Sequence, residues 1–284
     1  MLKLNLVHPE KSDIDYSISR FPDGEVQITI GKFDRKHPIT VGCRITSAEE
    51  LFILMQVIDI LERQEVVYSL EIFYLMGMRM DRVMDFSRPF TLKIVGDILH
   101  NCKANKIVFT EIHSNRIYKL YPQDYRFRDP SKINYFSLLV NRIDEEEALN
   151  TETFQIVFPD EGAYERYGNM INTHSFNKHS AIKCKKVRDL ETGKIQSIEV
   201  LNPQLLDGRP LLIIDDLCDA GGTFIGVAEA LRKHTDVLMD IFVIHMVNPK
   251  GIENLSKTYR RVWFTNSYKD WENLPENCTQ IEII

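Results

Sequence analysis

The cysteines of this sequence form no pattern that would cross-link the fold or bind zinc. They are five in number, widely scattered and without a C-x-x-C pair: Cys43, Cys102, Cys184, Cys218 and Cys278. Disulfide frameworks and structural zinc sites use even or closely spaced sets of cysteines. We therefore expect reduced thiols, which are typical of a cytoplasmic protein.

Long hydrophobic runs are also missing. No apolar stretch is long enough to span a bilayer, and the opening residues MLKLNLVHPE contain no apolar segment typical of a secretory signal. The formal net charge is -6 and no basic block occurs, which argues against non-specific binding to nucleic acid or to an anionic membrane. A local basic site for a phosphate group remains compatible with this charge.

Short apolar runs of strand length recur along the 284 residues and alternate with helix-like stretches. The runs are rich in β-branched or aromatic residues: HPITVG, SLEIFYLMG, KIVFTEIH, TFQIVFPDEG, RPLLIIDD and DIFVIHMV. The alternation predicts an α/β fold in which two mostly parallel sheets are flanked by helices. An acidic, weakly apolar stretch at 141–153 separates two such series, so we expect domains at 1–145 and 146–284.

Apolar residues at helical spacing predict helices over 47–64, 89–103 and 222–234. Ser47 and Glu50 have the spacing of a capping box at the start of the first of these helices. In open α/β sheets, ligands bind beyond the carboxyl ends of the strands. Polar motifs that follow the apolar runs are therefore the candidates for function.

The stretch LLIIDDLCDAGGTF at 211–224 has the features of a ribose 5-phosphate site. The run LLII predicts a buried strand that ends at the carboxylates of Asp215 and Asp216, and the loop at 219–223 then opens a helix. Glycines let loop amides turn toward a ligand, and a helix N-terminus favours an anion such as phosphate. Carboxylates accept hydrogen bonds from sugar hydroxyls or bind hydrated Mg²⁺. A plain acidic turn before a capped helix is the alternative.

Two other phosphate-binding patterns are absent, because the sequence has no G-x-x-x-x-G-K-[ST] and no G-x-G-x-x-G after a strand. The stretch resembles instead the ribose-phosphate loop of the type I phosphoribosyltransferase fold. Two families share that loop: transferases that consume phosphoribosyl pyrophosphate, and the synthetases (ribose-phosphate diphosphokinases) that make it. The resemblance implies ribose-phosphate binding by Asp215, Asp216, Asp219, Ala220, Gly221, Gly222 and Thr223.

The segment RFPDGEVQI at 20–28 favours the synthetases of these two families. It resembles their F-x-D-G-E segment, which reaches into a neighbouring subunit and contacts the adenine of ATP. The resemblance gives that part to Phe21, Asp23 and Glu25. A hairpin turn around Asp23 and Gly24 is the alternative.

The segment YLMGMRMDRVMD, which begins at Tyr74, is similar to the Y-x-R-Q-D-R element of the synthetases. The similarity implies ATP contacts for Arg79, Asp81 and Arg82, and a guanidinium suits phosphate and base stacking. Met80 stands where the family usually has glutamine, which removes a polar contact to the nucleotide. A surface cluster of ion pairs is the alternative for these residues.

Three further segments resemble catalytic and metal sites of the synthetases. KIVFTEIHSNR places His113 where the family has a histidine near ATP and Mg²⁺, and IVFPDEGAYER offers Asp160 as a Mg²⁺ ligand. The basic segment at 183–194 resembles the mobile K-x-R loop, so Lys186 and Arg188 would neutralise the transferring phosphates. The alternatives are a structural role for His113 and a solvated hairpin for the segment at 183–194.

The resemblance covers about Arg20 to Lys250 and implies a divergent, compact synthetase. It is similar to the synthetases found beside nicotinamide-salvage enzymes, including those of bacteriophages. We expect a cytoplasmic protein, which for a viral protein means the cytoplasm of the host. The resemblance implies transfer of the β,γ-diphosphoryl group of ATP to the 1-hydroxyl of ribose 5-phosphate, with Mg²⁺, in a homodimer or hexamer. Ala220 replaces a threonine usual in the family, which leaves room for a larger acceptor such as ADP-ribose that would feed NAD salvage. A phosphoribosyltransferase and a non-catalytic synthetase-associated protein are the remaining alternatives.

Overall fold

The computed structural model describes residues 1–127, 154–171, 180–188 and 195–284, and these fall into two compact units. The first unit contains the described residues up to 127 and Ile284, and the second contains those from 154 to 283. The expected domain boundary between 145 and 146, and the expected junction at 141–153, lie outside the described residues.

The first unit contains a parallel sheet of four strands in the order β1-β4-β5-β6, and β2 and β3 form a separate antiparallel hairpin. Its elements are β1 (Leu2–Asn5), η1 (Pro9–Lys11), β2 (Tyr16–Arg20), β3 (Val26–Ile30), β4 (Ile39–Ile45), α1 (Ala48–Arg63), β5 (Tyr68–Leu75), α2 (Thr91–Asn101), β6 (Ile107–Phe109), α3 (Arg116–Leu120) and η2 (Tyr125–Phe127).

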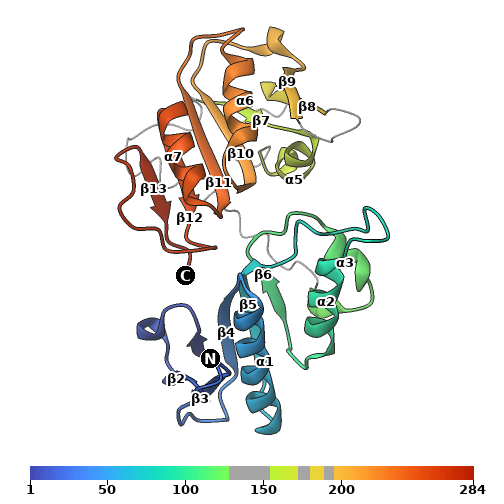
Figure 1. Ribbon diagram of the computed structural model, residues 1–284, viewed down its shortest axis with the longest axis vertical. Helices are drawn as coiled ribbons and strands as arrows, with labels where there is room; N and C mark the ends of the chain where they lie inside the picture. The colour runs from blue at the N-terminus through green and yellow to red at the C-terminus, as the bar shows by residue number, and fades with distance from the viewer. Residues whose placement is uncertain (128–153, 172–179, 189–194) are drawn as a thin grey trace. The chain divides into compact units, whose positions relative to one another are not determined.

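The predicted capping box at the start of α1 is confirmed. The Ser47 hydroxyl accepts a hydrogen bond from the Glu50 amide at 3.2 Å, and the Glu50 carboxylate accepts one from the Ser47 amide at 3.0 Å. Helix α1 runs alongside β4 and β5 (Figure 1) and buries an apolar face made of Ile53, Leu54, Val57, Ile58 and Leu61. Burial of this face, rather than helix propensity alone, holds α1 against the sheet.

The second unit contains a sheet of seven strands in the order β13-β12-β11-β10-β7-β8-β9, in which every neighbouring pair except β8 and β9 is parallel. Its elements are β7 (Gln155–Phe158), α5 (Glu161–Ile171), β8 (Ile182–Arg188), β9 (Ile195–Val200), η5 (Pro203–Leu205), β10 (Leu211–Cys218), α6 (Gly222–Leu231), β11 (Met239–Met246), α7 (Pro249–Thr258), β12 (Val262–Thr265) and β13 (Cys278–Ile281).

Helices cover both faces of this second sheet (Figure 1). Residues of α6 and α7, such as Phe224 and Leu255, share one core with Ile213 of β10. On the opposite face, Tyr167 of α5 shares a second core with Ile214. Successive strand residues point to opposite faces, so a strand that is apolar throughout is buried on both sides. The predicted α/β class with parallel sheets flanked by helices is confirmed.

Two segments differ from the sequence-based expectation. Strand β10 does not end at Ile214 but continues through both aspartates, because it stays paired with β11 as far as Cys218. Lys186 lies inside β8 and is paired with Ile198 of β9, whereas we expected it in a loop. The alternation of buried Ile182 and Cys184 with polar lysines explains this strand. Residues 189–194 lie outside the description.

The five cysteines all lie in the protein interior. All five cysteines are free and buried, and burial raises the pKa of the Cys184 and Cys218 thiols to about 12. Among the described residues, no helix is both long and apolar enough to cross a membrane.

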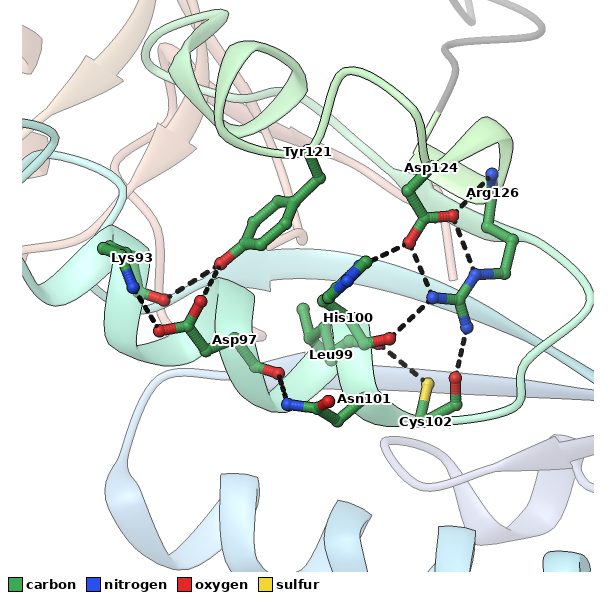
Figure 2. Close-up of polar contacts among 9 residues, drawn as sticks. All are labelled: Lys93, Asp97, Leu99, His100, Asn101, Cys102, Tyr121, Asp124 and Arg126. Carbon is green, nitrogen blue, oxygen red and sulfur yellow. Dashed lines mark hydrogen bonds and ion pairs between the residues drawn. The ribbon is translucent and has the colours of Figure 1, made fainter.

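Figure 2 shows a polar network that links α2 to the segment after α3. The Arg126 guanidinium donates to both carboxylate oxygens of Asp124, at 2.8 and 2.6 Å, and to the backbone carbonyls of His100 and Cys102 at the end of α2. His100 Nδ1 lies 2.8 Å from Asp124 Oδ2, and its ring stacks on Tyr121. A cation at these carbonyls caps the C-terminus of α2 and complements the helix dipole.

Asp124 gives a test of this network. Hydrogen bonds from Arg126 and His100 lower the pKa of Asp124 to about 2, against the opposing effect of its burial. A carboxyl that is more acidic in the folded state stabilises above about pH 4, and this contribution is lost as the pH falls through about 2. We expect Asp124→Asn to lower the free energy of unfolding by about 2 kcal/mol at pH 7, and by less toward pH 2, in urea titrations.

Asp59 provides the matched control, since it forms an exposed ion pair with Arg63 one helical turn away, at 2.9 Å. Exposed pairs of this kind contribute about 0.5 kcal/mol or less, so Asp59→Asn should change stability little. An Asp124→Asn effect no larger than that of Asp59→Asn, or one independent of pH, would contradict a stabilising role for the network.

Candidate functional site

Asp215 and Asp216 lie buried at the centre of the second sheet and share one cation. Their side chains are 8% and 2% exposed, and the Arg166 guanidinium Nη2 lies 3.0 Å from Asp215 Oδ1 and 2.7 Å from Asp216 Oδ1. Burial and the neighbouring Asp216 raise the pKa of Asp215, while Arg166 opposes the rise. Both carboxylates therefore need Arg166, because buried charge without a partner is costly.

Arg166 is the main residue of this site that the sequence analysis missed. It lies on α5, six residues after Asp160, and only 16% of its side chain is exposed. The segment IVFPDEGAYER contains it, but a single arginine on a predicted helix is usually solvated. Its pairing with aspartates about fifty positions away depends on α5 packing against β10, which the sequence does not show.

The segment 219–223 follows β10 and opens α6, as the motif predicts: residues 219–221 form the connecting loop and the helix begins at Gly222. Gly221 is the N-cap of α6 and has a φ of +83°, a left-handed conformation that favours glycine. As a glycine, the N-cap residue has no side chain with which to cap the first turn of α6. The backbone amides of a helix start without a side-chain cap, together with the helix dipole, form a site for an anion. Asp219, Ala220 and Gly222 are exposed beside it.

Lys186 and Asp160 form a partly buried ion pair in the same unit. The Lys186 ammonium lies 2.6 Å from Asp160 Oδ2, with side-chain exposures of 18% and 26%. Burial opposes ionisation of Asp160, but the hydrogen bond and charge of Lys186 outweigh it and lower the pKa of this carboxyl. Arg188 ends β8, and its side chain lies outside the description.

In the first unit, the segment at 20–28 forms the β2–β3 hairpin. The Phe21 amide donates to the Glu25 carbonyl at 2.8 Å, and the Asp23 carboxylate accepts from the Glu25 amide at 3.2 Å. Phe21 is 50% exposed, and Asp23 and Glu25 are exposed as well. The hairpin alternative is correct for the backbone, and the same turn presents an aromatic ring to the surface.

The RMDR segment is not a purely superficial ion-pair cluster, because Asp81 is only 3% exposed. Arg82 donates to both of its carboxylate oxygens, at 2.8 and 3.2 Å, and Arg116 lies 3.6 Å away. Against burial, the hydrogen bonds of Arg82 and Ser114 lower the pKa of Asp81. Arg79 and Arg82 are exposed. Asp81 therefore orients the Arg82 guanidinium, and its predicted contact with ATP stays a prediction.

His113 lies in the loop after β6, and no three acidic, histidine or cysteine side chains gather as a metal site within the part of the chain that is described. A Mg²⁺ ion that arrives with a nucleotide needs only one or two protein carboxylates, since phosphates and water complete its coordination. The partly exposed Asp160 carboxylate fits that smaller requirement.

Removing the cation between Asp215 and Asp216 tests its role. We expect Arg166→Met to lower the free energy of unfolding by about 3 kcal/mol at pH 7, because it removes the cation that two buried carboxylates share. The loss should grow with pH as those carboxyls ionise, and Asp215→Asn should restore part of it. Urea titrations of the single and double variants at several pH values measure both effects.

Arg232→Met is the control, since Arg232 makes an exposed hydrogen bond to the Thr258 carbonyl at 2.9 Å. It should cost less than about 1 kcal/mol at any pH. A pH-independent loss in Arg166→Met, or no recovery on adding Asp215→Asn, would show that the carboxylates do not need this cation.

No protein-family model matches the sequence. The chain is 25% identical over 241 residues to a protein named ribose-phosphate pyrophosphokinase from Maricaulis maris, covering 83% of this chain and 73% of that protein. Proteins of the same name from Mycoplasmopsis pulmonis and Vibrio cholerae are 24% and 26% identical, covering 93% and 82% of this chain and 79% and 71% of theirs.

The phosphoribosylpyrophosphate synthetase from Mycobacterium smegmatis has the same fold, with a TM-score of 0.77 and 19% identity, over 100% of this chain and 95% of that one. The sequence similarity thus extends over most of the chain and agrees with the fold. Over most of its length the chain is therefore similar to proteins named ribose-phosphate pyrophosphokinase.

Proposed function

We propose that the protein transfers the β,γ-diphosphoryl group of ATP to the 1-hydroxyl of ribose 5-phosphate, giving phosphoribosyl pyrophosphate and AMP. The observation that carries this proposal is the loop at 219–223, which opens α6 directly after the buried carboxylates of Asp215 and Asp216. The names of the similar proteins support the same reaction.

The ribose phosphate would be held by the end of β10 and the start of α6. The backbone amides from Ala220 to Thr223 would bind the 5-phosphate, because a helix N-terminus favours an anion. Asp219 and the two buried aspartates would accept hydrogen bonds from the ribose hydroxyls. Arg166 would keep the pair of carboxylates in place while they do so.

In the transfer, the 1-hydroxyl oxygen attacks the β-phosphorus in line. The bond from the β-phosphorus to the oxygen that bridges to the α-phosphate breaks, AMP leaves with that oxygen, and the hydroxyl proton is lost. Lys186 and Arg188 would stabilise the charge that develops on the phosphoryl oxygens. Because Lys186 is paired with Asp160 in the ligand-free protein, a substrate phosphate would replace a carboxylate as its partner.

ATP binding is proposed for residues of the first unit. The exposed Phe21 ring would stack on adenine, with Asp23 and Glu25 beside it on the same hairpin. If Phe21 acts across a subunit contact, as the resemblance implies, the active form would be a homodimer or a larger oligomer.

Further nucleotide contacts are proposed for Arg79, Asp81 and Arg82, and Asp81 also orients the Arg82 guanidinium. We propose Asp160 and His113 as ligands of Mg²⁺, which would supply positive charge to the phosphates when bound.

A parallel assay tests the reaction and its acceptor. AMP release from ATP is measured with ribose 5-phosphate and with ADP-ribose, and we expect release with ribose 5-phosphate. Release with ADP-ribose alone would favour the larger acceptor for which the exposed Ala220 leaves room. Consumption of phosphoribosyl pyrophosphate together with a base would indicate a transferase, and no reaction with any acceptor would indicate a non-catalytic homologue.

Lys186 gives a sharper test with a neighbour as control. We expect Lys186→Ala to lower kcat by about 100-fold or more, because a fixed cation at a transferring phosphoryl group is worth roughly that much, while ribose 5-phosphate binding changes little. Lys185 is exposed on the same strand, so Lys185→Ala should keep near wild-type turnover. Equal turnover in both variants would remove Lys186 from the mechanism.

A further inference from the structure

One side of α7, together with its N-cap Asn248, lies directly against the proposed ribose-phosphate loop. Asn248, Gly251 and Asn254 follow one another at intervals of three residues, and Leu255 comes next. Residues at this spacing share one face of a helix. Each of the four contacts, or closely approaches, the loop segment 219–221. These residues form the loop-facing side of α7.

Gly251 permits the closest of these approaches. A Cβ atom at position 251 would lie 2.2 Å from the backbone carbonyl oxygen of Asp219, and 3.0 Å from the sulfur atoms of Cys218 and Met246. A backbone carbonyl cannot rotate away as a side chain can. Any residue larger than glycine at position 251 would therefore displace the peptide group of Asp219 by about 1 Å. Helix α7 and the loop are thus in contact through backbone atoms.

Two asparagine side chains hold the same loop by hydrogen bonds. Asn254 Nδ2 donates to the Ala220 carbonyl at 2.9 Å, and Asn248 Nδ2 donates to Asp219 Oδ1, also at 2.9 Å. Asn248 is in addition the N-cap of α7, because its side-chain oxygen accepts from the Lys250 amide at 3.0 Å. Leu255 lies 3.4 Å from the position of a Cβ at Gly221, which closes the other side of the turn.

The loop needs such external support. It contains Gly221 in a left-handed conformation and Gly222 next to it, and glycines lose the most conformational freedom on folding. The N-cap of α6 is Gly221, which has no side chain that could fix the first amides of the helix by a hydrogen bond. Binding groups must be held to within about 0.5 Å to act on a substrate efficiently.

We propose that Gly251 and Asn254 are positioning residues for the ribose-phosphate site. They fix the carbonyls of Asp219 and Ala220, so that the following amides keep the orientation in which they meet a phosphate. The role rests on the proposed function of the loop. It adds to that function a second element, α7, on which acceptor binding depends although α7 itself does not contact the acceptor.

Asn254→Ala separates positioning from stability. It removes the hydrogen bond to the loop, so we expect the KM for ribose 5-phosphate to rise about three- to tenfold, with the KM for ATP unchanged. Alanine is a better helix former than asparagine, so the melting temperature should stay the same or rise. Gly251→Ala displaces backbone and should lower kcat/KM for ribose 5-phosphate by about 100-fold.

Asn277→Ala is the matched control, since it acts on the other end of the same helix. Asn277 Nδ2 donates to the carbonyls of Ser256 and Tyr259 at 2.9 and 3.0 Å. Its loss should lower the melting temperature and leave the KM for ribose 5-phosphate unchanged. We therefore expect opposite results: Asn254→Ala raises the KM without lowering the melting temperature, and Asn277→Ala lowers the melting temperature without raising the KM. A general weakening of α7 would instead change both quantities together.

Hydrogen-exchange mass spectrometry of the loop peptide completes the test without turnover. Faster exchange at 219–223 in Asn254→Ala, but not in Asn277→Ala, supports the proposal even if Gly251→Ala fails to fold. Unchanged exchange and unchanged KM in Asn254→Ala overturn it. If the wild-type protein releases no AMP with ribose 5-phosphate, the proposed reaction is wrong, and the exchange comparison still decides the positioning role.

Discussion

The pairing of Arg166 with Asp215 and Asp216 is the interaction on which the second unit depends. Two carboxylates at the centre of a seven-stranded sheet are stable only with a fixed partner, and α5, the helix that follows β7, supplies it. The same helix follows the loop that carries Asp160, which in turn meets Lys186 of β8. The charges of this unit thus determine how α5, β8 and β10 meet.

Similar pairing occurs throughout the candidate site. Asp81 is held by Arg82 and lies near Arg116, and Asp160 is held by Lys186, so these two carboxylates are neutralised within the protein. Under the proposed function, substrate binding would exchange ionic partners rather than fill a site of unbalanced charge. Such an exchange would keep the buried charges stable before the ligand arrives, and a phosphate would compete for cations that are already in position.

Much of the fold follows from local patterns. The capping box at Ser47, the apolar face of α6 and the glycine loop are local features, and the sequence predicts each correctly. The partner of Asp215 could not be predicted, because Arg166 meets it only through packing of α5 on β10. Lys186 was expected in a loop, since a run of lysines hides the alternation that places it in β8. The role of Gly251 was likewise invisible, because its importance depends on a carbonyl distant in sequence.

The contact of α7 with the loop has a consequence for how this site can change over time. Helix α7 contacts the backbone at 219–221 through the hydrogen bond of Asn254 to the Ala220 carbonyl and through the close approach of Gly251 to the Asp219 carbonyl. The exposed side chain at position 220 takes no part in these two contacts. Substitutions at 220 could therefore accumulate without moving the amides proposed to meet the phosphate. If the loop binds the acceptor as proposed, acceptor preference would be an adjustable property, and a lineage could change acceptors through single replacements at one tolerant position.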